Sequence, residues 1–293
     1  MPSFKRIIDQ AHSYNIANLL KYALIKDFIN LLKFLLLISK IIKNVQFKYN
    51  NFEIYIPNEY ARTYYYLANL IKNKCNITSN EIILQNGLIF KYPSYDHSAF
   101  CHIYDTFFKE EYNLLEVKDK VVLDIRASLG DTSIYFAMKG AKKVYAYEPL
   151  KEIFEYLLLN IEINNYNKII VPINKAISNK KGKVYISPIR NWTGSSRTEV
   201  ERNKEGYWVD SELLKLDADI LKIDCEGCEY DIISNIKSLD YEEIMMEFHK
   251  GSKLLVNKLT DIGYNVNIIS EWSDKTHGII YAKKGARARR LVW

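Results

Sequence analysis

Glycine, proline and cysteine are all scarce in this sequence, with 11, 6 and 4 copies among 293 residues. The low glycine and proline contents exclude collagen-like and low-complexity chains. Hydrophobic residues make up 48% of the chain and charged residues 26%, which is typical of a globular protein. Four cysteines in a chain of this length do not build the disulfide framework of a small secreted domain. We therefore expect a folded protein in a reducing compartment, the cytoplasm.

Long uncharged hydrophobic runs are also absent. The most hydrophobic stretch, residues 23–45, contains five charged residues, and its longest uncharged run is 34–39, far below the ~18 residues of a membrane span. Lys26, Lys33 and Lys40 recur every seven residues, so they share one face of a helix. The sequence predicts a basic amphipathic helix that packs on its own domain, pairs with a partner helix, or contacts an anionic membrane through residues 16–45.

Positive charge is concentrated at the two ends of the chain. Residues 1–50 hold eight Lys or Arg against two Asp, and residues 283–293 hold five Lys or Arg and no acidic residue. Because the whole chain carries only +6, the body between these ends is net acidic. Two interpretations stay open: the ends contact an anionic surface or partner, or they are solvated and keep the protein soluble.

The hydrophobic pattern changes along the chain and predicts a main domain with an N-terminal extension. We expect residues 1–50 to be helical and residues 51–112 to be mixed, with strands at 52–56, 81–84 and 88–92 and a helix at 64–73. The strands predicted beyond residue 120 are 121–125, 143–147, 169–171, 183–186, 220–223, 244–248, 265–270 and 278–282. The helices predicted there are 132–139, 151–164, 230–236 and 253–262.

Strands that alternate with helices of this length imply parallel βαβ units with right-handed crossovers. The predicted fold is therefore a doubly wound, mostly parallel α/β sheet, and its last two strands lie close enough in sequence to form an antiparallel hairpin. The domains expected are an N-terminal extension at 1–112, the α/β domain at 113–284 and a basic tail at 285–293.

The strongest chemical signal is a predicted buried strand followed by a tight loop and the start of a helix. Ligands of a doubly wound sheet bind outside the carboxyl ends of its strands. Asp124 lies at the end of this strand, Gly130 allows a close turn, and Asp131 or Thr132 caps the helix. Glu148 ends the next strand, 24 residues after Asp124, where a carboxylate accepts hydrogen bonds from both hydroxyls of a ribose. The loop and this acid together predict a nucleoside site.

The loop also indicates which nucleoside. A dinucleotide requires the pattern G-x-G-x-x-G so that backbone amides approach its pyrophosphate, and this loop contains only Gly130, which disfavours NAD. S-adenosyl-L-methionine has no phosphate, and Asp124 suits the cationic amine at its methionine end, directly or through a water molecule. We therefore predict S-adenosyl-L-methionine as the cofactor.

Several stretches between residues 99 and 283 follow a known pattern. They are Glu111-Tyr112, Val122-Leu-Asp-Ile125 with Ala127 and Gly130-Asp-Thr132, Val144-Tyr-Ala-Tyr-Glu-Pro149, Asn160, Asn164, Ala176 and Leu221-Lys-Ile-Asp-Cys-Glu-Gly-Cys-Glu-Tyr230. In these stretches the chain resembles the FkbM family of S-adenosylmethionine-dependent methyltransferases. The resemblance implies a class I methyltransferase fold and methylation of hydroxyl oxygens of sugars or natural products. It implies a cofactor site made of Asp124, Ala127, Ser128, Gly130, Asp131, Thr132, Glu148, Pro149, Ala176 and Asp224.

Arg126 departs from this family, whose loop has a glycine at that position. The glycine lets the backbone approach the methionine moiety, whereas an arginine adds bulk and a positive charge beside a sulfonium cation. Three outcomes stay open: Arg126 points outward, it grips the cofactor carboxylate, or cofactor binding is weakened or lost.

Candidate catalytic residues follow two later strands. Asp224 and Glu226 come after the strand expected beside the first one, so they face the methyl end of the cofactor, and His249 follows the next strand. Any of the three is a candidate base for the proton of a hydroxyl acceptor, and a buried, hydrogen-bonded structural histidine is an equal interpretation of His249. For Glu229 we expect a helix cap or an ion pair with Lys222.

Metal ligation is considered for two groups of residues. The carboxylates near Asp224 have donor atoms that a divalent cation accepts, but no spacing requires one, so no metal is predicted. Cys225 and Cys228 have the spacing of a redox or zinc pair. The family has small apolar residues at both positions and the chain lacks a second such pair, so we interpret these cysteines as packing residues.

The acceptor is expected to contact residues 1–112 and the loop at 187–207, whose Trp192, Ser195 and two arginines suit a sugar or an anionic molecule. A solvated surface loop explains the same composition. We predict no nucleic-acid partner, because the chain lacks an N-P-P-Y-type motif and aromatic residues between its basic ones. A rival hypothesis is a non-catalytic binding protein in which Arg126 closes the cofactor site and the basic helix contacts a membrane or partner.

Overall fold

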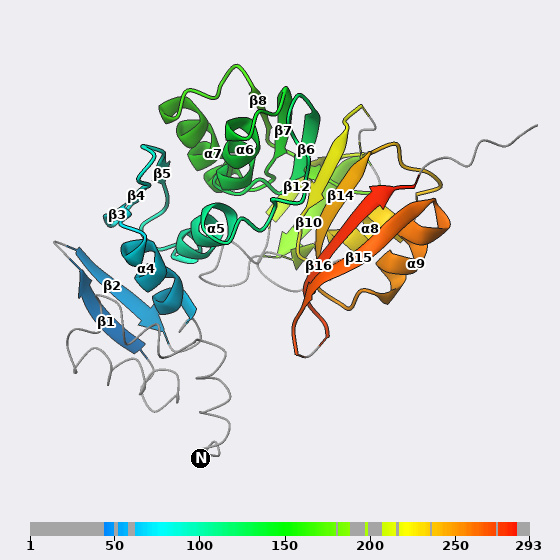
Figure 1. Ribbon diagram of the computed structural model, residues 1–293. Helices are drawn as coiled ribbons and strands as arrows, with labels where there is room; N and C mark the ends of the chain where they lie inside the picture. Colours follow the sequence, from blue (N-terminus) through cyan, green and yellow to red (C-terminus); the bar gives the residue numbers. More distant parts are fainter. Residues whose placement is uncertain are drawn as a thin grey trace, which may run out of the picture. The chain divides into compact units, whose positions relative to one another are not determined.

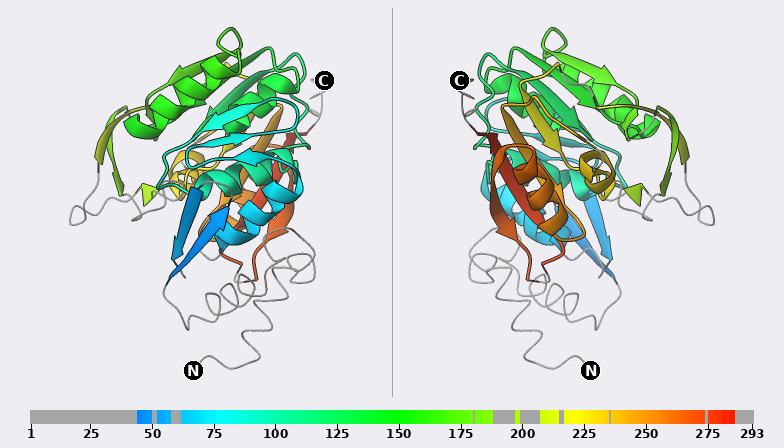
Figure 2. Two further views of the ribbon diagram at one scale, coloured as in Figure 1. Left: turned by 90° about the vertical axis from the view of Figure 1, so that its left-hand side faces the viewer. Right: turned by 90° about the vertical axis from the view of Figure 1, so that its right-hand side faces the viewer.

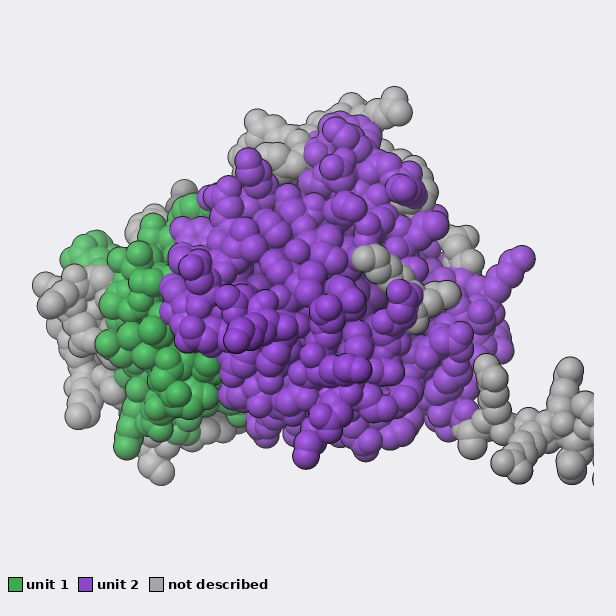
Figure 3. Space-filling model, turned by 90° about the horizontal axis from the view of Figure 1, so that it is seen from above, with its two compact units in different colours: residues 1–109 green, residues 110–293 purple. Residues whose placement is uncertain are grey.

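The computed structural model describes residues 44–49, 52–57, 62–179, 181–187, 197–198, 207–214, 217–234, 236–273 and 275–285 (Figure 1). The chain divides into two compact units, residues 1–109 and 110–293, which Figure 3 colours green and purple. Most of the predicted amphipathic helix and the tail at 286–293 lie outside the described residues. No helix of the described part is long and apolar enough to cross a membrane.

The first unit contains two small sheets and two helices. Strands β1 (Asn44–Tyr49) and β2 (Phe52–Pro57) form an antiparallel pair, and β3 (Asn76–Ile77), β4 (Glu81–Ile83) and β5 (Ile89–Lys91) form a three-stranded sheet. Helices α4 (Arg62–Lys72) and α5 (Ser98–Phe107) pack against each other.

The helical prediction for residues 1–50 is wrong at its end. Val45, Phe47 and Tyr49 alternate with Gln46 and Lys48, which is the period of a strand, and the partner strand β2 begins only three residues after β1 ends. The period-two pattern therefore outweighs the helical pattern that precedes it.

The second unit is built around a seven-stranded sheet in the order β15-β16-β14-β13-β6-β7-β8 (Figure 1). The strands are β6 (Val121–Ile125), β7 (Lys143–Tyr147), β8 (Ile170–Ile173), β13 (Ile220–Ile223), β14 (Glu243–Phe248), β15 (Tyr264–Glu271) and β16 (Gly278–Lys284). Within this sheet β16 runs antiparallel to both β14 and β15, and the other pairs are parallel. The predicted doubly wound sheet with a terminal hairpin is confirmed.

The helices of this unit are α6 (Asp131–Met138), α7 (Lys151–Ile163), α8 (Cys228–Ser234) and α9 (Lys253–Asp261). From β6 the chain moves outward through β7 and β8, whereas β13 and β14 extend in the other direction. Right-handed crossovers then place α6 and α7 on one face of the sheet and α8 and α9 on the other. Helix α9 packs against β15 and α8 (Figure 2). The sheet is covered on both faces, which explains why all four residues of β13 are buried.

This topology fixes the position of the site. The strand order reverses between β6 and β13, and their carboxyl ends lie side by side because Ile125 pairs with Ile223. Ligands of open α/β sheets bind in the crevice at such a switch point. The loops that follow β6, β7, β13 and β14 therefore surround the candidate site.

A second, four-stranded sheet has the order β11-β10-β12-β9. Its strands are β9 (Ala176–Ile177), β10 (Gly182–Ser187), β11 (Arg197–Thr198) and β12 (Tyr207–Glu212). The loop predicted at 187–207 is therefore wrong where it includes β11 and the start of β12, and its residues 188–196 and 199–206 lie outside the described residues. The alternation Trp208, Val209, Asp210 and Ser211 presents one face to solvent, with Trp208 59% exposed and Ser211 4% exposed.

Candidate functional site

The loop between β6 and α6 is a tight turn with a left-handed backbone at three positions. The φ angle is 63° at Arg126, 49° at Ser128 and 89° at Gly130. Glycine adopts this conformation without steric strain, whereas other residues are strained by it. This explains why glycine suits the position of Arg126. The amide of Ala127 donates to the carbonyl of Tyr147 at 2.8 Å, which ties the loop to the end of β7.

Glu148 lies directly after β7 and is 1% exposed. Its Oε2 accepts a hydrogen bond from the amide of Ser128 at 3.1 Å, and its Oε1 accepts one from the amide of Leu150 at 2.9 Å. Burial raises the pKa of Glu148 to about 7, although the positive charge of Arg126 and the two amides lower it. Glu148 therefore titrates near neutrality and is held against the loop after β6.

Asp124 is fully buried at the end of β6 and forms an ion pair with Lys222 of β13 at 3.0 Å. Its other oxygen accepts hydrogen bonds from the hydroxyls of Thr132 and Ser133, both at 2.6 Å. Lys222 also donates to the carbonyl of Arg126 at 3.1 Å. Burial lowers the pKa of Lys222, but the charge of Asp124 outweighs it and the net shift is upward. This network joins β6, α6 and β13 beneath the site.

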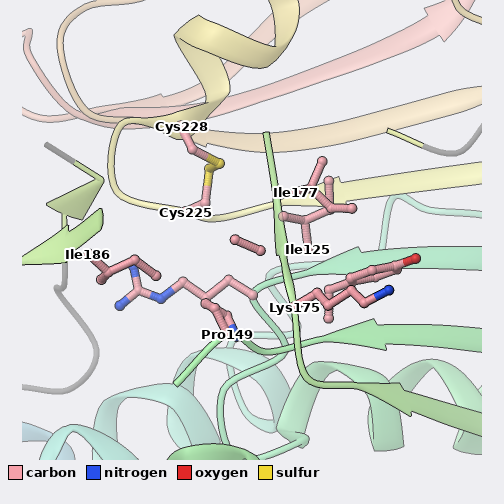
Figure 4. A pocket seen from close by; sticks show the side chains of 10 residues that line it. Ile125, Pro149, Lys175, Ile177, Ile186, Cys225 and Cys228 are labelled. Carbon is pink, nitrogen blue, oxygen red and sulfur yellow. A yellow bond between two sulfur atoms is a disulfide. The ribbon is translucent and has the colours of Figure 1, made fainter. Parts of the chain in front are cut away.

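A pocket lies beside the ends of β6, β7 and β9 (Figure 4). It is lined by Ile125, Arg126, Tyr147, Pro149, Lys175, Ala176, Ile177, Ile186, Cys225 and Cys228. Pro149 and Ala176, both predicted to bind the cofactor, are among these residues. The cavity volume is about 20 Å³, which is roughly the space of one water molecule. A cofactor-sized ligand needs several hundred Å³, so side chains of this pocket must move to admit one.

Cys225 and Cys228 are joined by a disulfide bond on the side of the pocket opposite Pro149 (Figure 4). The prediction that both are packing residues is therefore wrong, although both side chains are also buried in the core. The turn that leads from β13 into α8 brings their Cα atoms to 5.5 Å, a separation that suits a disulfide. Among the described residues, Cys75 and Cys101 are free thiols.

Four acidic side chains surround His249 at the carboxyl ends of β13 and β14. Its Nδ1 lies 2.9 Å from Glu229 Oε1, and the same carboxylate accepts the His249 amide at 3.2 Å. Its Nε2 faces Glu226 Oε2 at 3.5 Å, Glu247 Oε1 at 3.7 Å and Asp224 Oδ1 at 4.0 Å. The predicted catalytic residues Asp224, Glu226 and His249 are therefore brought together by the fold.

Burial and mutual charge shift the pKa values of this cluster. Burial lowers the pKa of His249, but its hydrogen bond to Glu229 and the charge of Glu226 outweigh burial and raise it. Burial also raises the pKa of Glu226, against the charge of Arg126. Burial raises the pKa of Glu247 well above its usual range, and the neighbouring Asp224, with which it shares a hydrogen bond, adds to the shift.

Two contacts of the site are not evident from the sequence. Glu229 fixes His249 instead of pairing with Lys222, although it also accepts the amide of Gly227 at the start of α8 at 2.8 Å, as a capping residue does. Glu212 of β12 accepts a hydrogen bond from the hydroxyl of Tyr147 and pairs with Lys175 at 2.9 Å. The sequence gives no signal for the second contact, because it depends on the small second sheet.

The remaining predicted cofactor residues lie in or next to the loop after β6. Asp131 is 3% exposed and stands in the first turn of α6, where a carboxylate stabilises the helix dipole. Thr132 contacts Asp124, as described above. Gly130 is the residue before α6, and a Cβ there would meet Leu157 Cδ1 at 2.7 Å. The backbone conformation of this position therefore favours glycine, and a larger residue would also displace the Leu157 side chain.

The sheet order, its single antiparallel strand and the loop with Glu148 at the switch point define a class I, Rossmann-like methyltransferase fold. Residues 124–266 match the methyltransferase FkbM domain. The predicted resemblance to the FkbM methyltransferase family is therefore confirmed over these residues. A match to this family implies that the methyl donor is S-adenosylmethionine.

Three further similarities are more distant. Uncharacterized protein 158B of Sulfolobus islandicus rod-shaped virus 1 is 28% identical over 148 residues, which is 50% of this chain and 68% of that protein. Precorrin-6y C5,15-methyltransferase from Geobacter metallireducens is 16% identical, with 59% of this chain and 85% of that chain covered and a TM-score of 0.35. The tRNA methyltransferase TrmK from B. subtilis is 14% identical, with 61% and 65% covered and a TM-score of 0.39.

Proposed function

We propose that the protein transfers the methyl group of S-adenosylmethionine to a hydroxyl oxygen of a sugar, a glycan or a related small molecule. The observation that carries this proposal is the cluster of Asp224, Glu226 and His249 at the ends of β13 and β14. It lies directly beside the loop after β6, since the amide of Asp224 donates to the carbonyl of Ile125 at 3.4 Å. An acidic cluster there suits an acceptor that must lose a proton.

The cofactor would be held by its ribose and its adenine. When its carboxylate is ionised, Glu148 accepts hydrogen bonds from the two ribose hydroxyls. These bonds replace its present hydrogen bonds from the amides of Ser128 and Leu150. Pro149 and Ala176 supply apolar walls for the adenine ring. Asp124 is already engaged by Lys222, Thr132 and Ser133, so it acts by fixing the loop that carries Ala127, Ser128 and Gly130.

The reaction needs alignment and one proton acceptor. Bound S-adenosylmethionine would supply a methyl group activated by its sulfonium, and the site would align the acceptor oxygen for in-line displacement of the sulfur. The hydroxyl proton passes to a base, and we assign Glu226 to this role. Asp224 shares a hydrogen bond with Glu247 and His249 is hydrogen-bonded to Glu229. Burial raises the pKa of Glu226, and a carboxylate with a raised pKa is a stronger base.

Arg126 is one of the side chains that would have to move before a cofactor entered this pocket, whose cavity volume is about 20 Å³. The same observation favours the second candidate function, a non-catalytic binding protein whose cofactor site Arg126 has closed. The two functions differ in whether the native chain transfers methyl groups at all.

The test is transfer of a labelled methyl group to a panel of sugars and hydroxylated small molecules. The native chain should methylate at least one acceptor, and Glu226→Gln should lower kcat by about 10²–10⁴-fold with a smaller effect on the KM for the cofactor. Asp261→Asn, an exposed substitution on α9, should leave turnover unchanged. The absence of both cofactor binding and methyl transfer to any acceptor would support the second candidate.

A further inference from the structure

Three side chains at the ends of β13 and β14 form a compact set of possible metal ligands. Asp224, Glu247 and His249 each offer one ligand atom, and these atoms all lie within 4.8 Å of one another. Octahedral or tetrahedral coordination with bonds of about 2.0–2.3 Å places ligand atoms about 3–4.6 Å apart. The observed set therefore has the dimensions of the coordination sphere of one ion.

The individual distances support the same conclusion. His249 Nε2 lies 3.7 Å from Glu247 and 4.0 Å from Asp224, which is too long for hydrogen bonds. The His249 side chain is 4% exposed, and its one hydrogen bond is made by Nδ1. Its Nε2 thus faces these two carboxylates, and Glu226 Oε2 at 3.5 Å, from a side chain that is almost fully buried.

Glu229 supplies the outer contact that metal-binding histidines commonly have. Its Oε1 lies 2.9 Å from His249 Nδ1, and the carboxylate is fully buried. A carboxylate on Nδ1 holds the proton on that nitrogen, orients the ring and leaves the lone pair of Nε2 for a metal. In that tautomer Nε2 is the ligand atom, and the contact with Glu229 fixes the direction of the ring.

The charge balance also favours a cation. Asp224, Glu226 and Glu247 all approach Nε2 of His249, so three acidic groups share one small, mostly buried volume. The nearby ammonium group of Lys222 is committed to Asp124 at 3.0 Å. The positive charge of Arg126 acts on Glu226, so a divalent cation held by Asp224 and Glu247 would supply the countercharge for these two carboxylates.

We propose that Asp224, Glu247 and His249 bind one divalent cation of the Mn²⁺ type. Two carboxylates and one imidazole combine the oxygen ligands that Mn²⁺ accepts with a nitrogen ligand that favours first-row transition metals over Ca²⁺ or Mg²⁺. The role of the cation rests on the proposed function: it polarises the acceptor hydroxyl while Glu226, outside the ligand set, receives the proton. Binding of the cation itself does not depend on that function.

The test is titration of the full chain with Mn²⁺ in the absence of cofactor, followed by the loss of the EPR signal of free Mn²⁺ and by calorimetry. We expect one Mn²⁺ per chain. Asp224→Asn and Glu247→Gln should each weaken binding at least 100-fold, and Glu229→Gln, which changes only the outer contact, about 10–100-fold. Asp261→Asn is the matched control, because it removes an exposed acid of the same unit.

Thermal unfolding of the metal-free variants gives a second readout. Mn²⁺ should raise the Tm of the native chain, and Glu247→Gln should abolish this increase. If Glu247 is a purely structural carboxylate, the variant should keep the increase in Tm that Mn²⁺ gives the native chain. If Glu247→Gln does not fold, the partly exposed Asp224→Asn tests the same expectation.

The two proposals fail in different ways. No Mn²⁺ binding at millimolar concentration, or equal binding by the native chain and Asp224→Asn, would overturn the metal site. In that case, methyl transfer in the absence of metal would leave the proposed function intact. Stoichiometric Mn²⁺ binding that Asp224→Asn abolishes, together with no binding of S-adenosylmethionine, would support the metal site and overturn the function.

Discussion

Glu148 should make the stability of this protein depend on pH, and Glu148→Gln should remove that dependence. The carboxyl is 1% exposed, and burial raises its pKa from an ordinary value of 4.5 to about 7. The folded chain therefore binds this proton more tightly than the unfolded chain. Its contribution favours the folded state at low pH and is lost as pH rises from 4.5 to about 7.

The magnitude follows from these two pKa values. Each unit of difference corresponds to about 1.4 kcal/mol, so full ionisation of Glu148 lowers the free energy of unfolding by roughly 3 kcal/mol relative to the protonated state. Part of this loss has already occurred at pH 5, where the unfolded carboxyl is mostly ionised. Between pH 5 and pH 8 the native chain should therefore lose roughly 2–3 kcal/mol through this group.

Urea unfolding at pH 5 and pH 8 measures this loss. The difference in unfolding free energy between the two pH values should be roughly 2–3 kcal/mol smaller in Glu148→Gln than in the native chain. The comparison cancels the other titrating groups. Glu155→Gln, which removes an exposed carboxyl on α7, should retain the native pH dependence. Parallel behaviour of Glu148→Gln and the native chain would refute the assignment of a raised pKa to Glu148.

Three further substitutions test the loop and the sheet. Lys222→Met should lower the unfolding free energy measured by chemical denaturation by about 3–5 kcal/mol, because it removes the buried partner of Asp124. The double variant Lys222→Met, Asp124→Asn should recover part of the lost stability. Arg126→Gly should relieve about 1 kcal/mol of strain from the left-handed backbone at this position. The variant should also bind S-adenosylmethionine more tightly in calorimetry at pH 8. Weaker binding would mean that the Arg126 side chain contacts the cofactor directly. Gly278→Ala should lower Tm by several degrees, because its Cβ would lie 2.2 Å from the carbonyl of Ser270; an unchanged Tm would contradict the hairpin geometry.

The seven-stranded sheet was predictable because its strands are short apolar runs separated by helices of regular length. Val121–Ile125 and Ile220–Ile223 are recognisable from their sequences alone. β12 was not predicted, since its sequence is polar at Asp210, Ser211 and Glu212 and its position depends on pairing with β10. The strand at Asn44–Tyr49 was misassigned because a helical pattern precedes it.

The site was predictable only where position in the fold determines a residue's surroundings. Glu148 follows from its place at the end of the second strand. The Asp124–Lys222 pair depends on the register between β6 and β13, in which these residues are direct neighbours. The contact of Glu229 with His249 depends on how α8 packs beside the end of β14. The disulfide was not predictable, because the spacing of Cys225 and Cys228 suits packing, redox and metal-binding roles equally.

The central claim is that this chain binds S-adenosylmethionine through Glu148 at the switch point of its sheet. Calorimetric titration of the native chain and of Glu148→Ala at pH 8, where the carboxyl is ionised, tests it most directly. The account predicts binding by the native chain with a Kd in the micromolar range. It predicts affinity weaker by about 1–3 kcal/mol in the variant, since charge-assisted hydrogen bonds are lost. Equal affinity of the two chains, or no binding by the native chain at millimolar cofactor, would contradict it.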